Sequence, residues 1–156
     1  MKDTQTALRW ITDILKKHHV PFQIAGGLAA IAYGSTRELE DIDIDIPEEK
    51  FSIIKDEVES FITFGPAQFK SDSWDLLLMT LNYHGQDIDL SGAHTTKIYD
   101  KQNRKWKKLI TDFSKVNFIN LYGVDLPVIP REELIAYKTA LARPVDLLDV
   151  KQLEGK

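Results

Sequence analysis

The hydrophobic positions at the start of the chain recur at helical spacing and predict a first helix over about residues 4–18. Its inner face carries three apolar residues, Leu8, Ile11 and Leu15. A short buried strand is predicted over residues 22–25. Gly26 and Gly27 then turn the chain into an alanine-rich helix over residues 28–33. The predicted order is therefore helix, strand, glycine turn, helix.

Further along, the pattern changes from helices to hairpins. A helix is predicted to begin after Pro47 and to end at Gly65 and Pro66. Strands are predicted over residues 74–83, 86–91, 109–113, 117–121 and 124–128. Prolines 130 and 144 suit the first turns of two last helices. We therefore predict a single α+β domain over residues 1–156, a mixed β-sheet with helices packed on it and further helices at the C-terminal end.

The most informative stretch is residues 41–46, where three aspartates alternate with three isoleucines. In a β-strand all three carboxylates fall on one face and all three isoleucines on the other. Two like charges about 4 Å apart repel by about 1 kcal/mol in water and about 4 kcal/mol at an effective dielectric of 20. A divalent cation removes this cost, and Mg²⁺ prefers carboxylate oxygens. The pattern favours a metal site; an edge strand with one solvated face is the alternative.

Composition narrows the class of protein. The 156 residues are 43% hydrophobic and 28% charged, as in ordinary globular proteins. A net charge of −4 argues against a general nucleic-acid coat but not against a local contact. The absence of cysteine excludes disulfides, thiol catalysis and Cys-ligated zinc. Because there is neither an apolar run of ~18 residues nor a signal-peptide layout, we expect a cytoplasmic protein with no membrane partner.

A second alternating acid pair, Asp87 and Asp89, lies on the predicted neighbouring strand. Pairing of the two strands would bring Asp89 or Asp87 beside Asp41 and Asp43. Glycine lets a backbone approach a ligand closely, and free N–H groups at a helix start attract phosphate. Three carboxylates beside a glycine turn could therefore hold divalent ions and a triphosphate, as phosphoryl transfer by two metal ions requires.

Three motifs together resemble the nucleotidyltransferase superfamily with the DNA polymerase β-like fold. They are Ala25-Gly26-Gly27, Tyr33-Gly34-Ser35-Thr36-Arg37 and Asp41-Ile42-Asp43-Ile44. Residues 126–138 and 143–149 also resemble the C-terminal helices of small stand-alone bacterial members, among them antibiotic nucleotidyltransferases and toxins of toxin–antitoxin pairs. The resemblance covers roughly residues 20–155, with the core motif at 24–46, the third acid at 86–91 and the C-terminal helices at 130–155.

The resemblance implies a metal-binding and catalytic set of acids. Asp41 and Asp43 match the metal-binding pair. Asp89 matches the third acid, which in active members is the candidate base for the acceptor hydroxyl, and Asp87 is the alternative for that role. The implied cofactor is Mg²⁺ or Mn²⁺, and the implied substrate is an NTP.

The resemblance also implies a nucleotide-binding set. Gly26 and Gly27 match the turn that contacts phosphate, and Lys138 matches a helix lysine that reaches the nucleotide phosphates. Arg37 is placed to reach phosphate or to brace the carboxylates. Two alternatives stay open: Arg37 is a simple counter-charge to the aspartates, or Lys138 forms a surface ion pair with the glutamates one turn back.

Two residues depart from the family pattern. Leu39 stands where many relatives have a threonine, and Asp45 is an acid that the pattern does not require. Near the last helix, Arg143, Asp146 and Asp149 are interpreted as caps and ion pairs.

The basic stretch over residues 97–108 is the one feature that bears on the acceptor. Six cations, Lys97, Lys101, Arg104, Lys105, Lys107 and Lys108, are interleaved with Tyr99 and Trp106. Such a patch could guide RNA, with an aromatic ring to stack on a base, or it could be a solvated loop.

The sequence therefore predicts transfer of a nucleoside monophosphate from an NTP to an acceptor hydroxyl, with release of pyrophosphate. The acceptor could be RNA, a small molecule or a protein. One alternative is a catalytically silent member that binds a nucleotide or a partner protein. Another is an RNA-modifying toxin controlled by an antitoxin-like partner.

Overall fold

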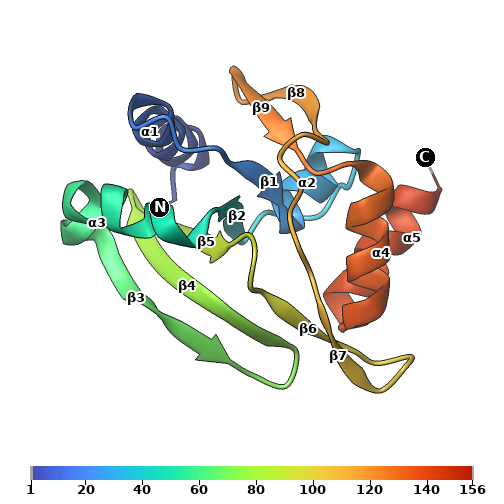
Figure 1. Cartoon of the computed structure of the whole chain (residues 1–156). Coiled ribbons are helices and arrows are strands. Elements are labelled where there is room, and N and C mark those ends of the chain that lie inside the picture. The colour runs from blue at the N-terminus through green and yellow to red at the C-terminus, as the bar shows by residue number, and fades with distance from the viewer. Residues whose placement is uncertain (1, 156) are drawn as a thin grey trace.

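The computed structural model describes residues 2–155 and confirms the predicted α+β class, a mixed β-sheet with helices packed on it (Figure 1). The helices are α1 (Thr4–Lys17), α2 (Gly26–Ala32), α3 (Phe51–Val58), α4 (Arg131–Leu141) and α5 (Pro144–Glu154), with 3-10 turns η1 (Glu48–Lys50) and η2 (Glu59–Phe61). The strands are β1 (Gln23–Ala25), β2 (Asp41–Ile46), β3 (Ile62–Lys70), β4 (Trp74–Tyr83), β5 (Gln86–Gly92), β6 (Lys97–Asp100), β7 (Lys105–Lys108), β8 (Asn117–Leu121) and β9 (Val124–Val128). Among residues 2–155, none of the helices combines the length and the apolar composition that a membrane crossing needs.

The strands form one sheet in the order β7-β6-β4-β5-β2-β1-β9-β8, with β3 also paired to β4. β2 and β5 run parallel, as do β1 and β9, and the other neighbours run antiparallel. In Figure 1, β3 and β4 form a long hairpin away from α4 and α5, which lie side by side at the other end.

The acidic strand β2 lies in the middle of this sheet, between β1 and β5. Its isoleucines, Ile42, Ile44 and Ile46, are 0% exposed and belong to the core. Its aspartates project from the opposite face, as the alternation predicted. The edge-strand alternative is wrong because β2 has a hydrogen-bonded neighbour on each side.

Three predicted segments need correction. The helix expected to reach Gly65 ends earlier, and residues 62–70 form β3, in which the Gly65-Pro66 pair falls at a shift of the β3–β4 register rather than at a helix end. Residues 109–113 are irregular rather than a strand. The basic stretch is not a loop, because Lys97–Asp100 and Lys105–Lys108 pair as an antiparallel hairpin.

Candidate active site

The register of the parallel pair β2–β5 brings the two acid pairs together. Asp43 lies opposite Asp89, and Asp41 lies opposite Asp87. A cleft of about 570 Å³ opens over this face of the sheet, and it is lined by Asp41, Asp43, Asp45 and Asp89. Asp87 does not line the cleft; it is exposed and accepts a hydrogen bond from Asn82 Nδ2 at 2.8 Å. Of the two candidate third acids, Asp89 therefore lines the cleft and Asp87 does not.

The carboxylates of Asp41, Asp43 and Asp89 line one cleft without an ion-pair partner among residues 2–155. Burial, reinforced by the charges of Asp89 and Asp41, raises the pKa of Asp43 well above its usual range. Burial and the charges of Asp41 and Asp87 raise the pKa of Asp89 to about 6, and burial with the charge of Asp87 also raises the pKa of Asp41. Among residues 2–155, no ion pair reaches Asp41, Asp43 or Asp89. Burial and the neighbouring negative charges thus disfavour the ionised carboxylates, and a bound cation would favour them.

Asp45, the additional acid, lies at one end of this row. Its Oδ2 accepts a hydrogen bond from Thr111 Oγ1 at 2.9 Å. Burial raises the pKa of Asp45 to about 7, although the Thr111 hydrogen bond acts in the opposite direction. Thr111 belongs to the irregular segment between β7 and β8, and that segment is tied to β1 because Gln23 Nε2 donates to the carbonyls of Asp112 and Lys115 at 3.2 and 3.1 Å.

The glycine turn is packed directly against the acids. Gly26 has a φ of +58°, which favours glycine, and a Cβ at this position would overlap the carboxylate of Asp43. The Gly26 N–H donates to Tyr137 Oη at 2.7 Å, so this predicted phosphate donor already has a partner. Gly27 lies under the guanidinium of Arg37, which a Cβ would also overlap. Both glycines are thus explained by close approach to charged side chains.

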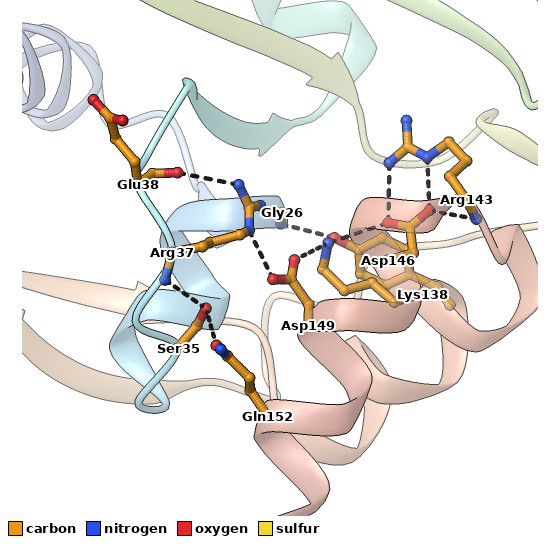
Figure 2. Close-up of polar contacts among 10 residues, drawn as sticks. Gly26, Ser35, Arg37, Glu38, Lys138, Arg143, Asp146, Asp149 and Gln152 are labelled. Carbon is orange, nitrogen blue, oxygen red and sulfur yellow. Dashed lines mark hydrogen bonds and ion pairs between the residues drawn. The ribbon is translucent and has the colours of Figure 1, made fainter.

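Arg37 and Lys138 meet in a buried ion cluster (Figure 2) rather than at the motif aspartates. Arg37 Nε donates to Asp149 Oδ1 at 2.7 Å, and Lys138 Nζ lies 2.9 Å from Asp149 Oδ2 and 3.3 Å from Asp146 Oδ1. Asp146 also accepts two hydrogen bonds from the Arg143 side chain, at 2.6 and 3.0 Å, and one from its backbone N–H at 3.2 Å. Asp146 and Asp149 therefore act as caps and ion pairs, as the sequence indicated.

One of the two alternatives for these cations is wrong. Lys138 is 2% exposed, so it is not a surface lysine paired with the glutamates one turn back. Arg37 forms its ion pair with Asp149, and its charge also acts on Asp41, whose pKa it lowers, so the counter-charge alternative stays open. Both side chains nevertheless line the same cleft as the aspartates.

Sequence comparison alone finds no relatives: no protein-family model matches the chain, and no curated protein matches it. Solved structures do match. TM1012 from Thermotoga maritima, a candidate nucleotidyltransferase, is 22% identical with a TM-score of 0.70, covering 99% of this chain and 92% of that one. The lincosamide antibiotic adenylyltransferase LnuA, bound to lincomycin, is 17% identical with a TM-score of 0.65, over 99% and 98% of the two chains. ANT(2″)-Ia in complex with adenylyl-2″-tobramycin is 15% identical with a TM-score of 0.61, over 96% and 87%.

The chain has the nucleotidyltransferase fold. Within that fold, the chemistry of the donor set suits a divalent ion, because three carboxylates without cation partners face one cleft. Their oxygens are not drawn tightly together in this structure. The one group of three acidic or histidine side chains in residues 2–155 whose ligand atoms all lie within 4.8 Å of one another is Glu48, Glu49 and His94.

That second group is a loop anchor. The Glu48 carboxylate accepts hydrogen bonds from His94 N at 3.0 Å, from Thr95 N at 2.8 Å and from Thr95 Oγ1 at 2.7 Å. These bonds hold the turn after β5, so the Glu48 side chain is already engaged.

Sequence reasoning missed two side chains that shape the nucleotidyltransferase-fold cleft. Tyr137 supports the glycine turn, and Thr111 binds Asp45. Tyr137 directly precedes Lys138 in α4, but nothing in the sequence distinguishes it from an ordinary core aromatic. Thr111 lies in the stretch that was predicted as a strand.

Proposed function

We propose that this chain, acting as one domain over residues 1–156, is a nucleotidyltransferase that uses an NTP and a divalent metal ion. The observation that carries the proposal is the row of carboxylates from β2 and β5, which face one cleft without any cation partner in residues 2–155. A catalytically silent protein has no need to keep this repulsion. The fold shared with LnuA and ANT(2″)-Ia supports the same class of reaction.

Asp41, Asp43 and Asp89 would hold Mg²⁺ or Mn²⁺. The bound metal would supply charge neutralisation at the triphosphate and help to lower the pKa of the acceptor hydroxyl. The protein itself would hold the carboxylates in register through β2–β5 pairing and hold Asp43 against the glycine turn. These are positioning tasks that a rigid central sheet performs well.

In the proposed reaction, the acceptor oxygen forms a bond to the α-phosphorus, and the bond from that phosphorus to the bridging oxygen of the β-phosphate breaks. Pyrophosphate leaves with the bonding electrons. The acceptor proton goes to Asp89, which lines the cleft and lies opposite Asp43 on the neighbouring strand. Arg37 and Lys138, which line the cleft, would bind the phosphates of the NTP.

The first test is thermal stability with each of the four NTPs, with and without Mg²⁺. The wild type is compared with the Asp41→Asn/Asp43→Asn double variant. A metal-dependent rise in Tm with an NTP, absent from the variant, would support the site and identify the donor. No rise with any nucleotide would reject the enzyme and favour the silent, partner-binding alternative.

One observation favours RNA as the acceptor over a small molecule or a protein. The hairpin β6–β7 places Lys97 directly opposite Lys108, and Tyr99 directly opposite Trp106, in a chain with a net charge of −4. Like charges on facing residues destabilise a hairpin, so an anionic ligand would relieve this pair. Lys108 also lines the cleft, so the hairpin and the aspartates contribute to the same cleft.

The RNA candidate is tested with a labelled single-stranded RNA oligomer and fluorescence anisotropy. The Lys97→Glu/Lys108→Glu variant should bind more weakly and with a shallower salt dependence than the wild type. A Lys16→Glu/Lys17→Glu variant at the end of α1 is the matched charge control. Equal binding by all three proteins would show that the hairpin does not bind RNA. A small molecule or a protein would then be the candidate acceptor.

A further inference from the structure

Asp149 connects two cations that come from distant parts of the chain. Its Oδ1 accepts from Arg37 Nε at 2.7 Å, and its Oδ2 lies 2.9 Å from Lys138 Nζ. Arg37 lies between α2 and β2, whereas Lys138 lies on α4. Figure 2 shows the carboxylate of Asp149 between the two cationic groups.

The Asp149 carboxylate does not line the cleft, although the two cations that it pairs with do. Arg37 and Lys138 line the cleft, but Asp149 does not and is 0% exposed. It therefore cannot contact a ligand in the cleft directly. It can only act on such a ligand through the two cations that it holds.

One donor of Arg37 remains available to the cleft. Arg37 uses Nε for Asp149 and Nη1 for the Glu38 carbonyl at 3.3 Å. Its Nη2 has no hydrogen-bond partner in residues 2–155 and lies over Gly27, next to the glycine turn. Asp149 thus fixes the Nε side of the guanidinium and leaves Nη2 free to bind an anion.

Asp149 is not the only residue that attaches α5 to the loop among the residues described. One turn further along α5, Gln152 Oε1 accepts from Ser35 Oγ at 2.8 Å and from the Thr36 N–H at 3.0 Å. A buried carboxylate is costly to desolvate, and Asp149 Oδ2 receives no well-directed hydrogen bond. Docking alone would not need such a group.

We propose that Asp149 is a positioning residue for triphosphate binding, which holds Arg37 and Lys138 at the spacing and orientation that the phosphates require. This inference rests on the proposed function, because it takes the two cations to be the phosphate ligands. Asp149 acts here as the outer partner of a binding group, in the way that outer-sphere carboxylates orient metal ligands.

The test measures the dissociation constants of Mg²⁺·ATP and of inorganic tripolyphosphate by titration calorimetry. Three variants are compared with the wild type: Asp149→Asn, Asp149→Glu and Gln152→Ala. Asp149→Asn should raise both dissociation constants at least about tenfold, and Asp149→Glu, which keeps the charge but moves it, should give a smaller rise. Gln152→Ala loosens the same contact between α5 and the loop, and should change them less than about twofold. The rise in Tm produced by Mg²⁺ alone should be the same in all four proteins, because Asp149 does not touch the acids.

Each other outcome overturns the inference. Tighter binding by Asp149→Asn would mean that the carboxylate competes with phosphate instead of positioning its ligands. Unchanged binding by Asp149→Asn would mean that the cations need no anchor, and an equal loss in Gln152→Ala would reduce Asp149 to a docking contact. If Asp149→Asn does not fold, Asp149→Glu decides, and wild-type affinity in that variant would reject positioning. A wild type that binds neither probe would reject the proposed function as well, so the two failures are distinguishable.

Discussion

Asp41, Asp43 and Asp89 in the cleft and Asp146 and Asp149 on α5 are all at least partly buried, but only the two on α5 form ion pairs with cations. Asp146 and Asp149 are 0% exposed and form ion pairs with Lys138, Arg37 and Arg143. The acids of the cleft have no such partners in residues 2–155, and their pKa values are raised. The fold therefore supplies cation partners for the acids of α5, whereas the acids of the cleft have room to bind a cation from solution.

Asp146 and the acids of the cleft also respond to pH in opposite directions. Burial alone would raise the pKa of Asp146, but hydrogen bonds from Arg143 and the charges of Arg143 and Lys138 outweigh it and hold the pKa below its usual value. Asp146 therefore contributes stability that is lost as pH falls through its lowered pKa. For the cleft acids, the folded state binds protons more tightly than the unfolded chain, so their contribution is lost as pH rises through their raised pKa values.

The largest expected effect comes from removing one unmatched acid. Asp43→Asn should lower nucleotidyl transfer by at least about a hundredfold, because a metal ligand matters more than the outer partners, whose loss typically costs 10–100-fold. The same variant should melt at a higher temperature than the wild type in the absence of metal, since one repelling charge is gone. Pyrophosphate release and a thermal melt in EDTA measure the two effects. Wild-type activity in this variant would remove the metal site.

The next effect comes from breaking the matched cluster. Lys138→Met leaves two buried carboxylates short of a cation and should lower the free energy of unfolding by about 3–5 kcal/mol, measured by urea denaturation. Lys17→Met is the control, because Lys17 pairs with Glu57 at an exposed site, where the expected change is below about 1 kcal/mol. A similar decrease in the free energy of unfolding in both variants would show that burial does not make the Lys138 ion pairs more important than an exposed one.

The sequence predicted the acidic face of β2 because strict alternation fixes which side chains share a face. It could not choose between Asp87 and Asp89, because a slip of two residues keeps both acids on that face. The contact between Arg37 and Asp149 joins residues 112 positions apart, and no local pattern encodes such a pair. The strand β3 was missed because Gly65 and Pro66 signal the end of a helix as well as a bulge. Local chemistry was therefore predictable, whereas long-range pairing was not.

A smaller effect is expected at Asp45, the additional acid of the row. Its pKa rises from 3.8 to about 7 on folding, so the wild type loses stability as pH rises through this window. Asp45→Asn does not titrate and should be more stable than the wild type by up to about 4 kcal/mol at pH 8. The gain should shrink as pH falls from about 7 toward about 4. Urea denaturation at a series of pH values checks this, and a gain that does not depend on pH would contradict it.

The smallest effect is expected at Asp87, which shares the face of Asp89 but lies outside the cleft. Its charge contributes to the raised pKa values of Asp41 and Asp89, so Asp87→Asn should lower both values slightly. Protons compete with a metal for carboxylates, and the variant should therefore bind Mn²⁺ up to about twofold more tightly at pH 6, with no change at pH 8. Calorimetric titration at the two pH values measures this, with Asp89→Asn as the matched variant that should lose binding at both. If Asp87→Asn loses metal binding and Asp89→Asn keeps it, the third acid is Asp87. The metal would then bind at the Asp41–Asp87 pair of facing residues instead of the Asp43–Asp89 pair.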